Sequence, residues 1–117
     1  KKTFVVTRGI DRCAWIYPMS EWNLIQKELN QLSSLSKTNR IFLRNHLRHA
    51  NILKFDSQGR FVLPQSLIDY TSIRKDVTII GVLNKIEIWN PNLLRKIDQS
   101  EEIDDQSYEQ LSERVNI

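Results

Sequence analysis

The sequence is poor in cysteine, glycine and proline, and its apolar runs are short: one cysteine, three glycines and three prolines occur among 117 residues. A single thiol, Cys13, cannot form an internal disulfide, which fits a reducing cytoplasm, and its expected place is a buried apolar site. No apolar run approaches the roughly 20 residues of a membrane-spanning helix. No basic start followed by an apolar stretch indicates a signal peptide. These absences argue against a disulfide-stapled secreted scaffold and against a membrane protein.

Signatures of catalysis are also missing. There is no P-loop, no G-x-G-x-x-G, no G-x-S-x-G and no H-E-x-x-H, and no pattern places two acids at acid/base geometry. His46 and His49 lie three residues apart, but a metal pair needs further ligands, and none is placed by spacing. The sequence therefore predicts no enzyme, no metal site, no cofactor and no small-molecule substrate.

Charge is divided unevenly along the chain. Residues 98–117 hold seven Asp/Glu and one Lys/Arg, a net charge of −6, whereas residues 1–97 hold 16 Lys/Arg and 7 Asp/Glu, a net charge of +9. A basic body suggests a polyanionic partner, and an acidic tail can screen that body or serve as a solvated spacer. The hydrophobic content of 40% and charged content of 26% are those of a globular domain.

Hydrophobic periodicity and capping residues predict alternating strands and helices. Ser36 and the pair Asn90-Pro91 are expected helix starts, and Asn84-Lys85 is an expected tight turn. The tail is expected to form a helix or to be disordered. The expected strands are 4–7, 14–17, 51–55, 60–63, 76–83 and 86–89, and the expected helices are 21–32, 36–49, 65–70 and 90–97.

Two segments 72 residues apart share one order of elements. "FVVTRGIDRCAWIYPMSEW" begins at Phe4 and "DVTIIGVLNKIEIWNPNLL" begins at Asp76. Each reads as strand, glycine, turn, strand, aromatic residue and helix. The pattern predicts two copies of one hairpin-plus-helix unit in an α+β fold.

The stretch "DSQGR", residues 56–60, has the chemistry of a rigid turn that carries an arginine. The Asp56 carboxylate can accept hydrogen bonds from backbone N–H groups that follow it. Gly59 can take a positive φ, which is costly for other residues. A guanidinium at Arg60 would then be aimed by the turn and could pair with phosphate or fork onto guanine. The alternative is an ordinary hairpin with a surface arginine.

The expected second helix carries a basic stripe, which consists of Lys37, Arg40, Arg44 and Arg48 at spacings of three and four. Such a stripe can follow a phosphate backbone. It can equally meet an acidic patch on a neighbouring subunit, or simply face water. The sequence leaves these three alternatives open.

These motifs together resemble the MraZ family of bacterial regulators. "DSQGRFVLPQSLIDYTSIRKDVTIIGVLNKIEIWNP" looks like the family's second half, "FVVTRGIDRCAWIYPMSEW" like the end of its first half, and "NRIFLRNHLRHANILKFDSQGR" like the link between the halves. The resemblance implies a swapped-hairpin, SpoVT/AbrB-type β-barrel made from two tandem βα repeats with helices around it. It divides the chain into 1–35 (remainder of the first half), 36–50 (linking helix), 51–97 (second half) and 98–117 (acidic tail).

The resemblance also implies a function. Members of the family form ring-shaped homo-oligomers and bind repeated boxes in the promoter of the division and cell-wall gene cluster, which includes their own gene. They act mainly as repressors, on the nucleoid in the cytoplasm. The family's Asp-x-x-Gly-Arg loop carries over to Asp56, Gly59 and Arg60. Charge near the expected strand turns adds four candidate phosphate contacts: Lys54, Arg74, Lys75 and Lys85.

The repeat makes one further prediction and leaves one alternative function. A first Asp-x-x-Gly-Arg loop would fall before Lys1, so the chain is expected to be an N-terminally trimmed form that has lost this DNA contact. The first copy could instead have lacked such a loop. The alternative function is an oligomerising, antitoxin-like protein-interaction module that acts through a protein partner.

Overall fold

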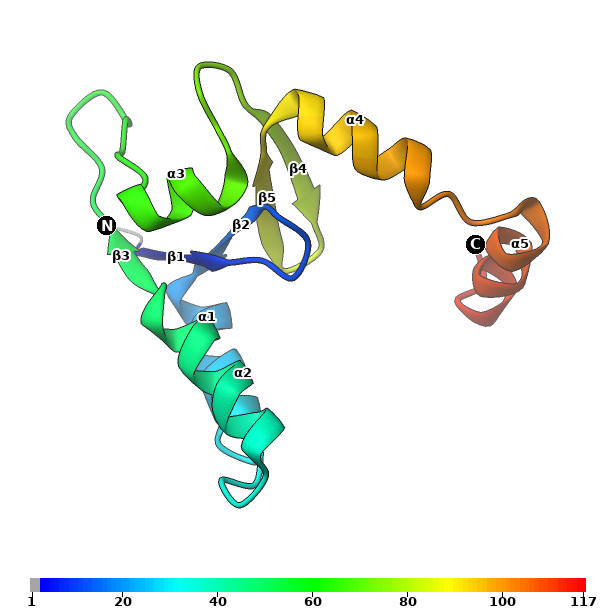
Figure 1. Ribbon diagram of the computed structural model, residues 1–117, viewed down its shortest axis with the longest axis horizontal. Coiled ribbons are helices and arrows are strands. Elements are labelled where there is room, and N and C mark those ends of the chain that lie inside the picture. The colour runs from blue at the N-terminus through cyan, green and yellow to red at the C-terminus, as the bar shows by residue number, and fades with distance from the viewer. Residues whose placement is uncertain (1–2) are drawn as a thin grey trace.

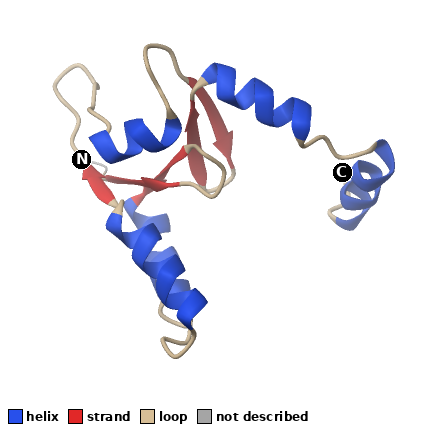
Figure 2. Ribbon diagram, viewed as in Figure 1, coloured by secondary structure: helices blue, strands red, loops and turns tan. Residues whose placement is uncertain are grey.

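The computed structural model describes Thr3–Ile117, which form a five-stranded antiparallel sheet and five helices (Figures 1 and 2). The α+β class predicted from the sequence is confirmed. The elements in chain order are β1 (Phe4–Arg8), β2 (Ala14–Pro18), α1 (Met19–Leu29), α2 (Lys37–Arg48), β3 (Asn51–Leu53), α3 (Gln65–Thr71), β4 (Thr78–Val82), β5 (Lys85–Trp89), α4 (Pro91–Ser100) and α5 (Asp105–Arg114).

The sheet joins the two predicted copies through their second strands. Its strand order is β3-β1-β2-β5-β4. Each copy contributes a hairpin, β1–β2 or β4–β5, followed directly by a helix, α1 or α4. The register at the junction pairs Ala14 with Ile88 and Trp15 with Glu87. Trp15 and Glu87 are 72 residues apart, so this one pair, at the centre of the antiparallel junction, joins two residues that the repeat also aligns.

The two hairpins differ at their turns. In the first, the Gly9 N–H donates to the Cys13 carbonyl at 2.8 Å. In the second, Val82 pairs with Lys85, which leaves a two-residue turn at Leu83-Asn84. The turn predicted at Asn84-Lys85 is therefore wrong by one residue, because Lys85 already belongs to β5. Leu83 has a φ of 55° and a fully exposed side chain.

The sheet is open, so the closed barrel expected from the family is not formed by the described residues. β3 and β4 are its two edges. The strand predicted at 60–63 is also wrong, since residues 60–64 form a loop. Phe61 and Leu63 pack against the core whereas Val62 is 85% exposed. The alternation of buried and exposed side chains thus comes from packing against the core, although the segment pairs with no neighbouring strand.

Capping chemistry places most helices where the sequence predicts them. The Ser36 side chain accepts a hydrogen bond from the Asn39 N–H at 3.2 Å and begins α2. Asn90 accepts from Asn92 at 2.9 Å and begins α4 with proline in its first turn. Asp104 begins α5, so the tail forms a helix. In the part of the chain that the structure describes, no helix is long and apolar enough to cross a bilayer.

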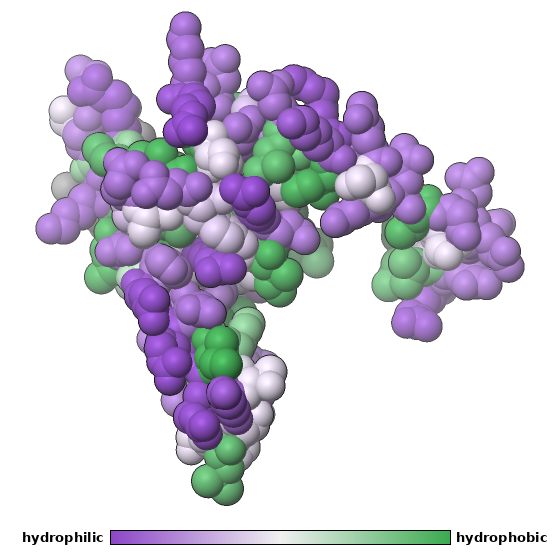
Figure 3. Space-filling view, viewed as in Figure 1, coloured by the Kyte–Doolittle hydropathy of each residue, from purple (hydrophilic) through white to green (hydrophobic). Residues whose placement is uncertain are grey.

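The sheet buries side chains on both faces. α3 covers one face and the α1–α2 pair extends from the other (Figure 1). One cluster consists of Val6, Ala14, Ile16, Leu53, Leu67, Ile73 and Ile88, and the other of Val5, Tyr17 and Trp22. The face seen in Figure 3 is largely hydrophilic and is interrupted by apolar patches. The core therefore fixes the sheet and α1–α3, and leaves the loops beyond them exposed.

Candidate nucleic-acid interface

The loop at residues 56–60 is a closed turn held by the Asp56 carboxylate. Its Oδ1 accepts hydrogen bonds from the backbone N–H groups of Gln58 at 2.9 Å and Arg60 at 2.8 Å. The Asp56 N–H donates to the Arg60 carbonyl at 2.8 Å, and Gly59 takes a φ of 78°. The hydrogen bonds and the positive φ predicted from "DSQGR" are therefore both present.

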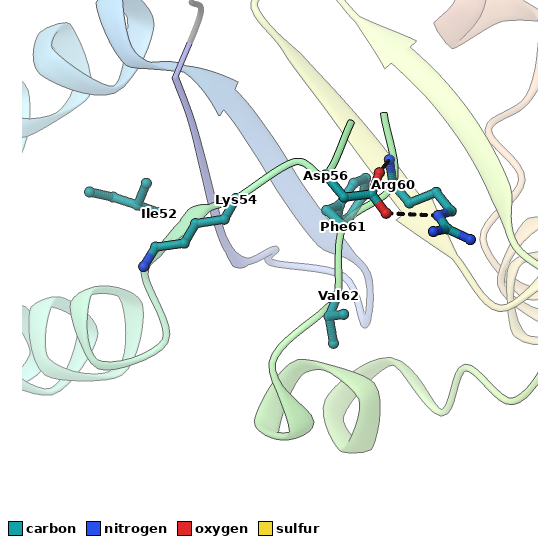
Figure 4. A pocket seen from close by; sticks show the side chains of 6 residues that line it. All are labelled: Ile52, Lys54, Asp56, Arg60, Phe61 and Val62. Carbon is teal, nitrogen blue, oxygen red and sulfur yellow. Dashed lines mark hydrogen bonds and ion pairs between the residues drawn. The ribbon is translucent and has the colours of Figure 1, made fainter. Parts of the chain in front are cut away.

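The same carboxylate orients the Arg60 side chain. Arg60 Nε donates to Asp56 Oδ2 at 2.8 Å (Figure 4). The Arg60 side chain is nevertheless 71% exposed. Within Thr3–Ile117, no hydrogen bond engages its two terminal nitrogens. The turn thus exposes the terminal nitrogens of the Arg60 guanidinium to solvent, and the Asp56 carboxylate fixes the direction in which they point.

The charge of Asp56 is stabilised by these contacts. Hydrogen bonds from the Arg60 backbone, the Arg60 side chain and the Gln58 backbone hold the pKa of the Asp56 carboxyl below its ordinary value. The carboxylate therefore stays ionised throughout the neutral range. Protonation of Asp56 in acid should weaken the hydrogen bonds that close the loop.

Lys54 lies beside this loop. It lines a concavity of about 650 Å³ together with Ile52, Phe61 and Val62, and with the Asp56–Arg60 pair. Figure 4 shows its ammonium group extended away from the Asp56–Arg60 pair. Lys54 therefore lies next to the loop in the same concavity, with its charge directed away from that of Arg60.

Arg74 and Lys75 lie on a second loop, between α3 and β4. Together with Asp76, they line a concavity of about 360 Å³ that also includes Asn90, Asn92 and Arg95 at the start of α4. This loop and the 56–60 loop project to the same side of the molecule (Figure 1). Arg95, which the sequence analysis did not single out, joins this group because it follows the Asn90 cap by about one helical turn and a residue.

Lys85 does not belong to that side. It lies at the start of β5, at the β4–β5 turn, which points away from the two loops (Figure 1). Its Nζ is 4.7 Å from the centroid of the Trp15 ring and 5.9 Å from that of Tyr17. The structure therefore brings Asp56, Gly59, Arg60 and Lys54 together, places Arg74 and Lys75 on the same side, and separates Lys85 from all of them.

Two arginines that the sequence analysis passed over tie the first hairpin to α3. Arg12 donates through Nε to the Tyr70 carbonyl at 3.2 Å and through Nη2 to Ser72 Oγ at 3.0 Å. The Arg8 guanidinium lies 4.2 Å from the centroid of the Tyr70 ring. These contacts join residues about 60 positions apart in the sequence, so no local pattern predicts them. They fix α3, and with it the loop that carries Arg74 and Lys75.

The remaining candidates for chemistry are structural. Cys13 is fully buried, as predicted, and burial together with nearby Glu87 and Asp11 raises the pKa of its thiol to about 12. His46 is stacked between Phe42 and Trp22, with ring centroids 5.6 and 6.1 Å away. Among the described residues, no group of three or more His, Cys, Asp or Glu is placed to hold a metal ion.

Comparison with known proteins agrees with the motifs. The model of the family described as "MraZ protein, putative antitoxin-like" matches residues 1–45 and 46–116, which together span almost the whole chain. The chain belongs to the MraZ family. The boundary between the two matches falls inside α2, between the two hairpins.

Several proteins named transcriptional regulator MraZ are similar to this chain. That of Clostridium tetani is 38% identical over 117 residues, which cover 98% of this chain and 78% of the relative. That of Natranaerobius thermophilus is 39% identical over 96% of this chain and 76% of the relative. That of Pediococcus pentosaceus is 45% identical over 74% and 61%. These MraZ relatives carry the names of regulators, which agrees with the expectation that the chain is not an enzyme.

Proposed function

We propose that the chain is a sequence-specific DNA-binding transcriptional repressor, which binds repeated boxes in the promoter of the division and cell-wall gene cluster, including its own gene. Its place of action is the nucleoid, in the cytoplasm. The observation that carries the proposal is the Asp56–Arg60 loop. An exposed guanidinium that is fixed through Nε, and whose terminal nitrogens have no hydrogen-bond partner within Thr3–Ile117, is prepared for bidentate recognition.

The mechanism follows from the chemistry of the fork. Two parallel N–H donors match the O6 and N7 acceptors of guanine in the major groove, or two oxygens of a phosphate. Because Asp56 already holds the side chain, less rotamer entropy is lost when Arg60 binds. Lys54, Arg74, Lys75 and Arg95 would contact phosphates around it. Lys85 is left out because its ammonium lies over Trp15 and Tyr17.

Assembly would multiply this contact. We propose a ring-shaped homo-oligomer, in which the family's swapped-hairpin arrangement completes the sheet that is open here. A ring repeats the Arg60 loop at regular spacing, and repeated boxes on the promoter meet repeated loops. Linked weak contacts then gain avidity without any new interaction.

Two variants test the role of Arg60. Arg60→Ala should cost about 1–3 kcal/mol of binding free energy and relax specificity, as expected for loss of a base-reading pair. Arg60→Lys keeps the charge but loses the fork, so it should lower the preference for promoter DNA almost as far. Fluorescence anisotropy with the chain's own promoter and with scrambled DNA measures both quantities.

The control is Lys27→Ala, which removes one positive charge from α1, away from the loop. It should leave the preference for promoter DNA unchanged. If Arg60→Ala weakens promoter and scrambled DNA equally, Arg60 is a phosphate contact and the base-reading role is wrong.

A second candidate function is the antitoxin-like interaction module, which the description of the matching family model favours. In that case the basic side would meet an acidic protein. DNA binding by the chain would then be weak and show little dependence on sequence, whereas a repressor should prefer its promoter under every salt condition tested.

A further inference from the structure

The C-terminal helix α5 presents an exposed apolar line. Tyr108, Leu111 and Val115 follow one another at spacings of three and four, which places them along one face. Their side chains are 64%, 52% and 62% exposed. In Figure 1, α5 lies apart from the sheet, beyond the connection at residues 101–104. A face of this kind is typical of a helix that packs against a partner.

A complementary groove lies between α1 and α2. It has a volume of about 290 Å³ and is lined by Leu43 and Leu47 of α2, with Gln26, Leu29 and Asn30 of α1. Leu47 is 44% exposed, although it belongs to a helix packed against α1. Three leucines and two amide side chains thus line the groove, and Leu47 is accessible to a partner.

Charges flank both apolar lines in the same way. On α2, Arg44 and Arg48 each follow a groove leucine by one residue, and Arg40 lies one turn earlier. α5 has an acidic stripe, which consists of Asp105, Glu109 and Glu113, and Glu109 follows Tyr108 by one residue. Both stripes have a spacing of four residues. Since one residue is about 100° of helical rotation, each stripe lies on the same side of its apolar line.

That shared side determines the orientation of the two helices. Suppose that two helices pack antiparallel with their apolar lines facing each other. The flank on one side of the first apolar line then lies against the flank on the same side of the second. An antiparallel register then aligns the whole of both stripes at once, as Arg48 with Asp105, Arg44 with Glu109 and Arg40 with Glu113. A parallel arrangement would place the acidic stripe on the opposite flank, next to α1. Arg40 donates to the Ser34 and Leu35 carbonyls through Nη1 and still has donors for Glu113.

We propose that α5 docks antiparallel into the α1–α2 groove of a second copy of this chain, through the apolar line and the paired stripes. A second copy is favoured because α4 carries the tail away from the α1–α2 pair (Figure 1). Four connecting residues span at most about 14 Å. This contact deepens the assembly part of the proposed function, but it requires no DNA.

Charge reversal and mixing test the contact directly. Arg44→Glu and Glu109→Arg should each weaken self-association of the full chain by about tenfold, because each places like charges opposite one another. An equimolar mixture of the two variants should recover association. In the mixture, the carboxylate introduced at position 44 of one copy meets the guanidinium introduced at position 109 of the other, while the native Arg44 and Glu109 also find each other. Sedimentation velocity at low salt measures all three samples.

A matched pair tests the apolar line. Leu111→Glu adds one negative charge within the line and should weaken association at least as much as the charge reversals. Gln110→Glu adds the same charge on the opposite face of α5 and should leave association unchanged. Neither side chain belongs to a described core cluster, so circular dichroism should show the same helix content for both variants.

Four results would overturn the proposal: a monomeric parent chain, single variants that associate like the parent, a mixture that fails to recover, or equal effects of Leu111→Glu and Gln110→Glu. Failure to recover would show that positions 44 and 109 do not meet between copies. Loss of DNA affinity in Arg44→Glu with unchanged association would assign the basic stripe to DNA instead. If the variants behave as expected but the parent shows no preference for promoter DNA, the assembly contact stands and only the repressor proposal fails.

Discussion

Gly59 determines whether the Arg60 loop can form. Its φ of 78° lies in the left-handed region, and a Cβ at this position would meet no atom within 4 Å. The cost of a substitution is therefore backbone strain alone, without steric overlap. That strain would act on the turn that aims Arg60.

Gly59→Ala should lower the free energy of unfolding by about 1 kcal/mol and weaken binding to promoter DNA. Gly81→Ala is the matched control, since a Cβ there also meets nothing within 4 Å and no positive φ is required. Denaturant unfolding and anisotropy measure the two effects. Equal behaviour of the two variants would mean that the left-handed turn does not constrain the loop.

Cys13 should be inert at neutral pH. With the pKa of its buried thiol raised to about 12, no thiolate forms in the folded chain at pH 8, so labelling by a thiol reagent should follow unfolding. An unfolded thiol ionises near its ordinary pKa of about 8.5. The free energy of unfolding should therefore fall as pH rises from that value towards 12. A Cys13→Ala variant should show a smaller fall, since only the buried Tyr17 hydroxyl, whose pKa is also raised, then contributes in this way. Rapid labelling of the native parent would contradict this account.

The residue scale also shows what a sequence can reveal about this site. The motif Asp-x-x-Gly-Arg predicts the turn, because the carboxylate and the glycine act within five residues. The Nε contact of Arg60 depends on a side-chain rotamer, and the cation–π position of Lys85 depends on residues of β2 about 70 positions away. The first is a local contact whose rotamer the sequence does not specify, and the second is not local at all. Charge near a turn selected Lys54, Arg74 and Lys85 alike, and the structure places Lys85 on another side of the molecule from the other two.

At the scale of elements, Glu87 clamps the junction between the two copies. Its two carboxylate oxygens accept hydrogen bonds from Trp15 Nε1 and Trp89 Nε1, each at 3.0 Å. Trp89 is buried and Trp15 is partly buried. Loss of the acceptor would leave two indole N–H groups to find other partners.

Glu87→Ala should lower the free energy of unfolding by about 1–3 kcal/mol, because partly buried donors lose their acceptor. Glu87→Gln keeps one amide oxygen and should fall between this variant and the parent. Glu28→Ala, an exposed carboxylate on α1, is the control and should have little effect. A Glu87→Ala variant as stable as the parent would show that water replaces the clamp.

His46 makes the docking of α2 sensitive to acid. Burial, and next the nearby charge of Arg8, lower the pKa of its imidazole below 6.5. A depressed pKa stabilises the folded state above about pH 6.5, and this contribution is lost as pH falls through the lower, folded value. The free energy of unfolding should thus decline below pH 6.5 in the parent and less steeply in His46→Phe. Identical slopes in the two proteins would contradict this role.

The starts of α2 and α4 were predictable, whereas the start of α1, which has no side-chain cap, and the closure of the sheet were not. Ser36 and Asn90 act on N–H groups two or three residues away, so their caps follow from sequence. The prediction of a strand at 60–63 was wrong because alternating apolar residues show only that one side of the segment is buried. A strand also needs a neighbouring strand to pair with, and the local sequence does not encode that neighbour. The barrel failed for the same reason: closure depends on what pairs with the edges β3 and β4.

Over the whole molecule, basic and acidic surfaces are separated. The 56–60 loop, the 72–77 loop and the start of α4 project to one side, while the acidic α5 lies at the end of α4 (Figure 1). This separation was predictable from the net charges of +9 and −6 in the two parts of the sequence. Which cations share a face was not, since that depends on how the two hairpins join.

The most direct test is anisotropy of the unmodified chain with its own promoter DNA and with scrambled DNA, over a series of salt concentrations. The repressor proposal predicts a preference for the promoter of at least about 10³-fold. It also predicts that the logarithm of affinity falls with the logarithm of salt by about 0.9 for each phosphate neutralised. Equal affinity for the two DNAs, or an affinity that salt does not change, would contradict it and favour a protein partner.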